Sequence, residues 1–327
     1  MTDASRTLVA ADIGGTHARF AIATISAGRV TALGPELVTR CADYASLQTA
    51  WEAFGVHIAE PLPRAAAIAV AGPAKGDVLK LTNNPWIIRP AQVNAKLGVD
   101  AHVLVNDFEA VAYAVGEAPP AQFRHLCGPE VPLPDAGVVS VLGPGTGLGV
   151  GLLLKIGGGD YRVIPTEGSH GDFAATDSIE DQILVHLRAK YRRVSAERVI
   201  SGPGLADIHA ALAALEGRAV PPQDDKALWT SALAGDDSLA AAALDRFCLA
   251  LGSFAGNIAL AQGASAVVIG GGLGARLADH LPRSGFAQRF AAKGRFETMM
   301  QGIPVKLITH PQPGLFGAAA AFARLNT

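Results

Sequence analysis

The sequence has few cysteines and no excess of either charge. Its three cysteines, Cys41, Cys127 and Cys248, stand far apart with no C-x-x-C spacing, which argues against both a zinc site and a disulfide framework. Lys and Arg total 27 against 29 Asp and Glu, giving a net charge of −2. Because no basic field exists to attract nucleic acid or an anionic membrane, we expect neither as a partner.

The sequence also shows no signal peptide and no clear membrane span. The amino terminus lacks a basic n-region, and the apolar stretch behind it is interrupted at Asp12. Of two longer uncharged stretches, Ala136 to Leu154 contains a Gly-Pro-Gly turn at its centre, which a spanning helix would not carry. The other, Phe247 to Ala275, is interpreted as a buried helix followed by a buried strand. A cytoplasmic location is therefore expected.

Apolar residues and glycine, by contrast, are abundant. Half of the residues are hydrophobic, only 17% are charged, and 37 of 327 are glycine, against a usual share of about 7%. Such a chain buries enough apolar surface to exclude disorder, and the absence of a three-residue glycine period excludes collagen. At about 150 residues per domain, the length predicts roughly two domains.

Short apolar runs alternate with helical patterns along the chain. Strands are expected at residues 7–13, 17–23, 65–71, 101–105, 267–269 and 303–308, and helices at 47–58 and 315–325. Asp177, with Glu180 three residues later, resembles a capping box at the start of a further helix. This alternation predicts the α/β class, with largely parallel sheets.

A weak internal repeat indicates two halves of similar construction. Val9 to Ile22 and Val138 to Leu153 each read as strand, glycine-threonine turn, strand. The stretch Glu117 to Asp135 contains five prolines and few apolar residues, so it is expected to connect the halves.

Three glycine clusters follow apolar strands. They are Asp12-Ile-Gly-Gly-Thr16, Gly143-Pro-Gly-Thr-Gly147 and Gly270-Gly-Gly-Leu-Gly274. Glycine lets backbone N–H groups approach phosphate oxygens, and threonine adds a hydroxyl donor. A single cluster is more typical of a tight hairpin, but three, two of them with threonine, favour a nucleotide-phosphate site.

Other nucleotide motifs fit less well. The sequence has no G-x-x-x-x-G-K-[ST] motif, which excludes a P-loop. Gly270-x-Gly272-x-x-Ala275 matches the relaxed dinucleotide pattern, but residues 289–293 provide no acid for a ribose hydroxyl, which disfavours a dehydrogenase. Asp12 lies on the first glycine turn, where a carboxylate beside phosphates requires a divalent cation such as Mg²⁺. The alternative role for Asp12 is to cap the turn.

Polar residues follow apolar strands at positions suited to a sugar. Asn106 and Asp107 end one strand and begin a helix, so Asp107 is either a helix cap or a general base that accepts a hydroxyl proton. Glu167 and His170 lie among small residues, an environment rich in hydrogen-bonding groups that suits a polyol. By composition alone, Glu197 is a solvent-exposed residue at a helix start.

Seven motifs together strongly resemble the bacterial glucokinases, and they match in order and spacing from residue 9 to about residue 317. They are Ala10 to Phe20, Leu81 to Asn83, Asn106 to Phe108, Leu142 to Gly149, Glu167 to His170, Val194 to Leu205 and Gly270 to Gly272. The resemblance implies an actin-like ATPase (ribonuclease H-like, hexokinase-type) fold with two α/β domains around a central cleft. It further implies a discontinuous small domain of residues 1–117 plus 311–327 and a large domain of residues 118–310.

The resemblance also implies the activity, ATP-dependent phosphorylation of D-glucose to glucose 6-phosphate, with ATP and Mg²⁺ as cofactors and a homodimeric assembly. Asp107 would be the catalytic base and Asp12 the residue that meets Mg²⁺. The implied sugar-binding residues are Asn83, Asn106, Asp107, Glu167, His170 and Glu197. The implied nucleotide-binding residues are Ala11, Asp12, Ile13, Gly14, Gly15, Thr16, Gly145, Thr146, Gly147, Gly271 and Gly272.

Two positions depart from the family pattern. His17 stands where the family usually has Asn, and Asn84-Pro85 replaces a more usual His-x pair before Trp86. The related sugar kinases with a cysteine-rich zinc loop are disfavoured by the scattered cysteines. Two other classes remain as alternatives: a sugar-responsive regulator, which would need a DNA-binding extension, and an actin-type nucleotide switch, which leaves the sugar-side residues unexplained. The strictness for glucose and for ATP is open.

Overall fold

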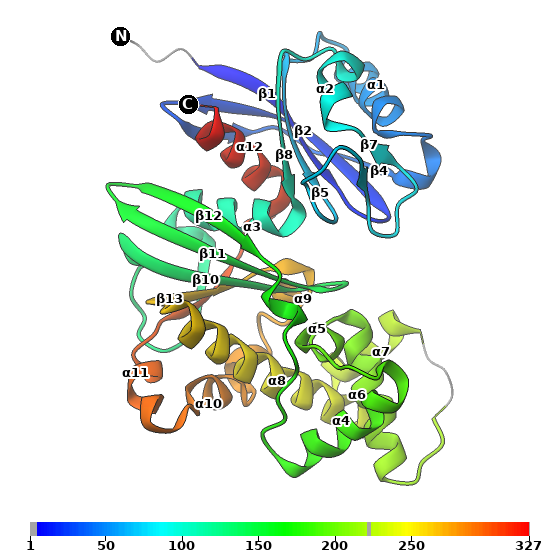
Figure 1. Ribbon diagram of the computed structural model, residues 1–327, viewed down its shortest axis with the longest axis vertical. Coiled ribbons are helices and arrows are strands. Elements are labelled where there is room, and N and C mark those ends of the chain that lie inside the picture. The colour runs from blue at the N-terminus through cyan, green and yellow to red at the C-terminus, as the bar shows by residue number, and fades with distance from the viewer. Residues whose placement is uncertain (1–4, 221–223, 327) are drawn as a thin grey trace. The chain divides into compact units, whose positions relative to one another are not determined.

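The computed structural model describes residues 5–220 and 224–326. The described residues form two compact units, which are 5–119 with 310–326 (unit 1) and 120–220 with 224–309 (unit 2). Each unit contains one six-stranded sheet with helices packed against it (Figure 1).

Unit 1 is built on a sheet of order β3-β2-β1-β5-β8, with β4 paired to β2. Its strands are β1 (Arg6–Ile13), β2 (His17–Ser26), β3 (Arg29–Leu33), β4 (Leu37–Arg40), β5 (Ala65–Val70) and β8 (Ala101–Asn106). A small second sheet pairs β6 (Leu79–Lys80) with β7 (Ile87–Ile88). The helices are η1 (Cys41–Asp43), α1 (Leu47–Ile58), α2 (Pro90–Leu97), α3 (Asp107–Glu117) and α12 (Pro313–Leu325).

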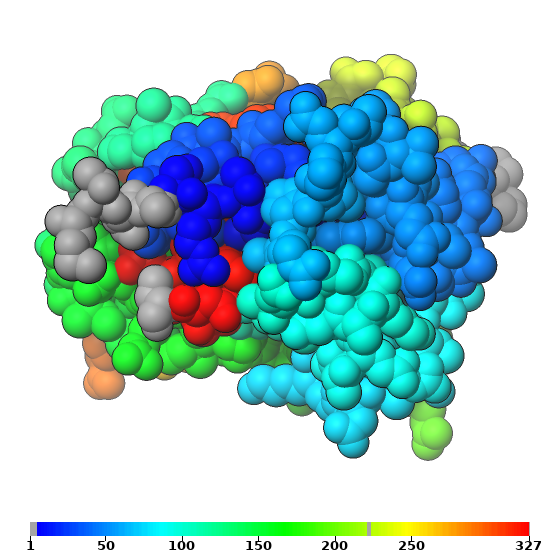
Figure 2. Space-filling view, turned by 90° about the horizontal axis from the view of Figure 1, so that it is seen from above, coloured from blue at the N-terminus to red at the C-terminus, as the bar shows by residue number. Residues whose placement is uncertain are grey.

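Helices cover both faces of this sheet. On one face, α1 buries Leu47, Trp51 and Phe54, and Phe54 stacks on Phe20 of β2 with ring centroids 5.5 Å apart. On the other face, α12 packs against α3 and the strands, and Figure 2 shows its red carboxyl end at the surface beside the blue start of β1. Residues near the carboxyl terminus therefore complete the amino-terminal unit.

The three parallel strands of unit 1 end in register. Ile13 of β1 lies opposite Val70 of β5, which lies opposite Asn106 of β8. Because ligands of α/β sheets gather at the carboxyl ends of strands, this edge is the expected place for a site.

Unit 2 is built on a sheet of order β12-β11-β10-β13-β14-β9. Its strands are β9 (Phe123–Cys127), β10 (Ala136–Pro144), β11 (Leu148–Gly157), β12 (Asp160–Thr166), β13 (Ala266–Ile269) and β14 (Val305–Ile308). Its α-helices are α4 (Ser178–Tyr191), α5 (Ala196–Val199), α6 (Gly202–Leu215), α7 (Asp225–Ala234), α8 (Ser238–Gln262), α9 (Gly271–Arg276), α10 (Phe286–Ala291) and α11 (Glu297–Gln301). Four 3₁₀ helices complete it: η2 (Pro120–Gln122), η3 (Gly168–His170), η4 (Leu281–Arg283) and η5 (Gly294–Phe296).

Helix α8 runs through the apolar core of unit 2. Among the described residues it is the one helix long and apolar enough to cross a membrane, yet 67% of its most apolar window is buried within the protein. It is followed by β13, so the interpretation of the second uncharged stretch as a buried helix and a buried strand is confirmed.

The repeat expected from the sequence is also present. β1 and β2 form an antiparallel hairpin around the first glycine turn, and β10 and β11 form another around the second. In each unit the first strand of the hairpin also pairs with a parallel strand, β5 or β13. The stretch Glu117 to Asp135, expected to connect the halves, contains the boundary between the two units at Pro119 and Pro120. It also contains β9, which pairs with β14. Arg124 and His125 within β9 break its apolar pattern, and its partner lies far along the chain.

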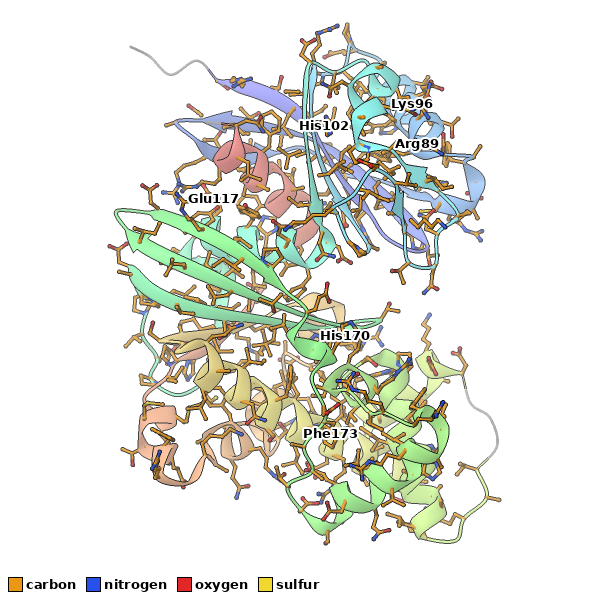
Figure 3. All side chains as sticks on the ribbon, viewed as in Figure 1. Arg89, Lys96, His102, Glu117, His170 and Phe173 are labelled. Atoms are coloured by element: carbon orange, nitrogen blue, oxygen red, sulfur yellow. The ribbon has the colours of Figure 1, made fainter. Side chains whose placement is uncertain are left out.

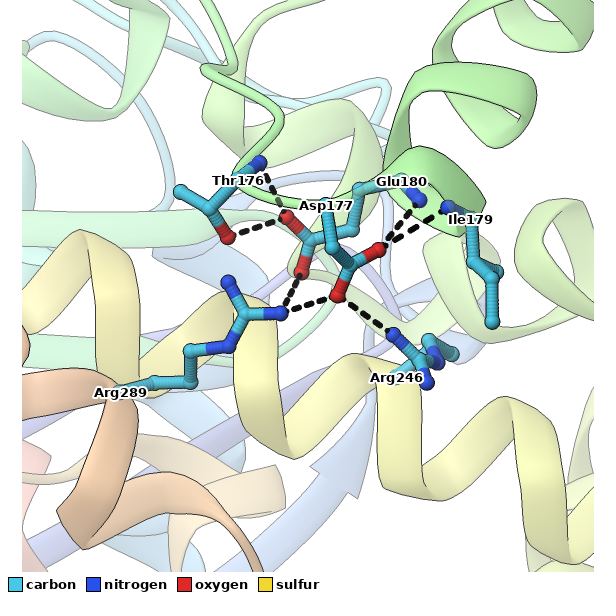
Figure 4. Close-up of polar contacts among 6 residues, drawn as sticks. All are labelled: Thr176, Asp177, Ile179, Glu180, Arg246 and Arg289. Atoms are coloured by element: carbon cyan, nitrogen blue, oxygen red, sulfur yellow. Dashed lines mark hydrogen bonds and ion pairs between the residues drawn. The ribbon is translucent and has the colours of Figure 1, made fainter.

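A cluster of ion pairs fixes the start of α4 to α8 and α10 (Figure 4). Asp177 accepts hydrogen bonds from the backbone N–H groups of Ile179 and Glu180, so it is the expected N-cap. It also accepts hydrogen bonds from the guanidinium groups of Arg246 and Arg289. The second hydrogen bond expected of the capping box, in which the Glu180 side chain would accept from the backbone N–H of Asp177, is wrong. Glu180 accepts instead from the backbone and hydroxyl of Thr176, both at 2.7 Å.

We expect Asp177→Ala to lower the free energy of unfolding by about 2–3 kcal/mol, because it removes a helix cap and the carboxylate shared by Arg246 and Arg289, and leaves Arg289 only its longer contact with Glu180 at 3.6 Å. Asp181→Ala is the matched control: it removes an exposed acid from the same first turn of α4. Urea unfolding of both variants measures the difference. Equal stabilities would contradict the role given to Asp177.

Candidate active site

The first glycine turn joins β1 to β2 in unit 1. Its Gly14 N–H donates to the carbonyl oxygen of His17 at 2.9 Å, which closes the turn. Gly15 packs so closely that a Cβ there would lie 2.9 Å from the carbonyl oxygen of Thr82, so only glycine fits. Thr16 is exposed. The turn thus presents backbone groups and a hydroxyl at the carboxyl edge of the sheet.

The residues that precede this turn divide by the direction of their side chains. Ala11 and Ile13 are fully buried in the core, so their side chains support the turn and are not available to a ligand. Asp12 lies on the opposite face, with its Oδ2 atom 3.7 Å from Arg19 Nη1. Burial raises the pKa of Asp12, against the lowering effect of the Arg19 charge.

Gly314, in the first turn of α12, is a site residue that the sequence reasoning missed. A Cβ at Gly314 would lie 2.5 Å from Asp12 Oδ2, so glycine is required for α12 to begin against this carboxylate. The signal was a glycine directly after the proline that opens the last helix, but its partner lies about 300 residues earlier in the chain.

Asn106, not Asp107, caps helix α3. Its Oδ1 atom accepts hydrogen bonds from the backbone N–H groups of Phe108 (2.9 Å) and Glu109 (3.2 Å), and its Nδ2 atom donates to the carbonyl oxygen of Gly72 (2.9 Å). The Glu109 side chain in turn accepts a hydrogen bond from the backbone N–H of Asn106 at 3.4 Å, which completes a capping box. The capping alternative for Asp107 is therefore wrong.

Asp107 is the first residue of α3, and its Oδ1 atom accepts a hydrogen bond from the N–H of Phe108 at 2.8 Å. Burial raises the pKa of this carboxyl to about 6, and the nearby Asp12 charge adds to the rise. A carboxylate with a pKa close to neutrality is suited to accept a proton from a hydroxyl. Asn83, exposed and with a φ of 56°, lies in the loop that Gly15 contacts.

Unit 2 brings together the Glu and His residues that the sequence singled out. His170 lies in η3, directly after β12 (Figure 3). Its Nε2 atom is 3.6 Å from Glu167 Oε2, and its Nδ1 atom is 3.8 Å from Glu197 Oε1. Arg193 donates to the carbonyl oxygen of His170 at 2.7 Å, which holds the turn. The cluster is therefore two carboxylates on either side of one imidazole.

Glu197 connects this cluster to the second glycine turn. Its Oε2 atom accepts from the N–H of Leu148 at 3.0 Å, and a Cβ on Gly147 would lie 2.5 Å from the same oxygen. The composition-based interpretation of Glu197 as a solvent-exposed helix start is wrong, because its side chain is 29% exposed and bound to another loop. No local pattern could show that contact.

The second and third glycine clusters meet in unit 2. Gly145 N–H donates to the carbonyl oxygen of Gly147 at 2.8 Å, and Thr146 at the tip is exposed. Gly271 has a φ of 74°, and a Cβ there would lie 2.7 Å from the carbonyl oxygen of Pro144. Gly272 has open space where a Cβ would stand. The third glycine cluster therefore begins against the end of β10, next to the second turn.

The candidate residues thus form one group in each unit. Unit 1 gathers Asp12, the first glycine turn, Asn83, Asn106 and Asp107 at the carboxyl edge of its sheet. Unit 2 gathers the second turn, Gly271 and the Glu167, His170 and Glu197 cluster.

The oxygen donors of unit 1 fit a Mg²⁺ ion held jointly by protein and phosphate better than a metal ion held by protein side chains alone. Within residues 5–220 and 224–326, no group of three or more His, Cys, Asp or Glu side chains is placed to hold a metal ion. Mg²⁺ needs only one or two carboxylates when phosphate oxygens and water complete its shell. Asp12 supplies one such carboxylate directly before the first glycine turn.

Comparisons with known proteins agree over nearly the whole chain. A family model described as Glucokinase matches residues 9–325. A glucokinase of Zymomonas mobilis is 62% identical over 316 residues, covering 97% of each chain. A solved glucokinase from an Antarctic psychrotroph has a TM-score of 0.85 at 33% identity, covering 97% of this chain and 99% of that one.

A Balamuthia mandrillaris glucokinase, solved in complex with glucose, has a TM-score of 0.79 at 21% identity, covering 98% of this chain and 94% of that one. That likeness concerns the fold. Together the structural matches confirm the expected α/β, actin-like fold.

Proposed function

This chain belongs to the glucokinase family, and on that premise we propose that it transfers the γ-phosphoryl group of ATP to the 6-hydroxyl of glucose. The proposal rests on the position of the Asp107 carboxylate and on its raised pKa. Its neighbour Asn106 caps the helix, which leaves the Asp107 carboxylate, with its raised pKa, at the sheet edge beside the glycine turn. The partly buried carboxylate accepts a hydrogen bond from the N–H of Phe108 and is not needed as the cap of α3, so it can accept a proton from a substrate hydroxyl.

In the proposed reaction, Asp107 accepts the proton of the 6-hydroxyl as its oxygen attacks the γ-phosphorus. The new bond joins O6 to phosphorus, the bond to the β,γ-bridging oxygen breaks, and ADP leaves. Asn83, Asn106, Glu167, His170 and Glu197 hold the other sugar hydroxyls. Most of the rate gain comes from positioning the two reactants and from stabilising charge. The proposal requires the groups of both units to act on one bound sugar.

The glycine turns are proposed to bind the nucleotide. Backbone groups at Gly14, Gly15 and Thr16, and at Gly145 to Gly147, contact phosphate oxygens, while the surface at Gly271 and Gly272 receives the adenosine. Asp12 would hold Mg²⁺, which when bound neutralises phosphate charge during transfer. A homodimer, which rests on the family resemblance, and a cytoplasmic location, which rests on the sequence pattern, belong to the same proposal; light scattering in solution tests the dimer.

A coupled ADP-release assay tests the function. We expect ADP release from ATP and Mg²⁺ to depend on glucose, and a panel of hexoses with ATP or polyphosphate as donor to define the specificity. ADP release that is independent of sugar would favour the nucleotide-switch alternative instead.

The raised pKa of Asp107 predicts an acid limb in the activity profile. A general base works only when it is deprotonated, so activity is present above its pKa and is lost as the pH falls through that value. We therefore expect log kcat/KM for glucose to decline below about pH 6 with a slope of one. A flat profile down to pH 5, in an enzyme that stays folded by circular dichroism, would contradict the assignment.

A further inference from the structure

Residues 81–86 (the 81–86 loop) are tied to the carboxyl ends of two parallel strands in unit 1. The Thr82 N–H donates to the carbonyl oxygen of Ala71, directly after β5, at 3.0 Å. The Asn84 Nδ2 atom donates to the carbonyl oxygen of Gly14, directly after β1, at 2.9 Å. The position of the loop therefore depends on the positions of both strand ends.

The Asn84 amide is held in one orientation. Its Oδ1 atom accepts a hydrogen bond from the backbone N–H of Trp86 at 2.9 Å, so its NH₂ group must face Gly14. Trp86 is itself fixed, because its indole is buried and its Nε1 atom donates to the carbonyl oxygen of Tyr44 at 2.9 Å. Asn84 is only 8% exposed, so water does not replace this contact easily.

The Asn84 amide connects the turn proposed to bind phosphate with the loop that contains Asn83, which is proposed to bind sugar. A Cβ on Gly15, in the phosphate turn, would lie 3.1 Å from Asn83 Cβ, so the turn packs directly on the residue proposed to bind sugar. Asn83 has left-handed backbone geometry, which a shift of its neighbours would disturb. Asn84 is adjacent to Asn83 in the chain and hydrogen-bonded to Gly14 next to Gly15.

We propose that Asn84 is a positioning residue, whose amide fixes the phosphate turn relative to the sugar-side residue Asn83. This inference rests on the function proposed above. Without the N–H donor, the turn and the 81–86 loop shift independently, so that nucleotide and sugar lose affinity together. The proton acceptor Asp107 lies at the start of α3, after β8, and keeps its environment. A displacement of about 1 Å in a reactive geometry can lower a rate by about 10²-fold.

Two variants test the role. Asn84→Asp keeps the acceptor for Trp86 but turns an oxygen toward the Gly14 carbonyl, and Asn84→Ala removes the bridge without adding charge. We expect both to lower kcat/KM for ATP and for glucose by about tenfold to 10²-fold. In Asn84→Ala the acid limb of the pH profile should keep its midpoint. Asn94→Asp is the matched control: its amide donates to the carbonyl oxygen of Asp100 at 3.1 Å, just before the amino end of β8 and away from the carboxyl ends of the strands, and it should behave as wild type.

Calorimetric binding of glucose and of a non-hydrolysable ATP analogue, measured separately, gives a readout independent of turnover. Weaker binding of both ligands, with melting temperatures close to that of Asn94→Asp, supports the proposal. Wild-type affinity for either ligand in both Asn84 variants overturns it. Loss of the folded state in both variants also overturns it, because the role is then structural. A wild-type protein that is inactive on glucose would refute the proposed function, while analogue binding would still report on Asn84.

Discussion

Asp107→Asn should lower kcat by about 10²–10⁴-fold and leave the affinity for glucose within about threefold of wild type. The amide has nearly the shape of the carboxylate and still offers an oxygen to the N–H of Phe108, so α3 should begin as before. It cannot take up the hydroxyl proton, however, so the attacking oxygen keeps its proton in the transition state. The loss should therefore fall on kcat and spare binding.

Asp100→Asn is the matched control for this variant. Asp100 directly precedes β8, the strand that Asp107 directly follows, and its exposed carboxylate pairs with Arg64. Stopped-flow or coupled kinetics should show wild-type turnover for Asp100→Asn, and calorimetry should show glucose bound by both variants. If Asp107→Asn retains wild-type kcat, Asp107 is not the base.

Gly317→Ala should destabilise unit 1 by about 3 kcal/mol or more, since backbone atoms cannot move aside as a side chain can. A Cβ at Gly317 would lie 1.7 Å from the carbonyl oxygen of Ala110 and 3.0 Å from the backbone nitrogen of Ala114. Helices α12 and α3 would therefore have to separate. Both helices begin at the candidate site, so Asp107 and Gly314 would shift as well.

Gly55→Ala provides the comparison for that prediction. Gly55 lies inside α1, and a Cβ there would meet only the Leu62 side chain at an ordinary 3.5 Å. Because alanine favours the helix by about 1 kcal/mol over glycine, this variant should match or exceed wild-type stability. Thermal and urea unfolding distinguish the two. Equal stability of Gly317→Ala and wild type would show that α12 and α3 are not in this close contact.

The parts of the structure that follow from local pattern were predictable from the sequence. Strand β1 and its hairpin partner follow from a β-branched and apolar run interrupted by a glycine turn. Helix α1 follows from the spacing of Leu47, Trp51 and Phe54, whose side chains are all buried. In both cases the residues that determine the element lie within it.

The parts that depend on distant contacts were not predictable. Glu197 is defined by its bond to Leu148, Gly314 by its approach to Asp12, and β9 by its pairing with β14. For Asp107 the local pattern allowed two roles. The side chain of Asn106, which takes both cap hydrogen bonds, excludes the capping role, and the role of base stays a prediction.

The most direct test of the central claim is ³¹P NMR of a reaction containing the protein, glucose, ATP and Mg²⁺. The account predicts one new phosphomonoester resonance, coupled to the two protons on C6 of the sugar, that grows in equal amount with ADP. Inorganic phosphate in place of a sugar phosphate, or a phosphate carried by another hydroxyl, would contradict it.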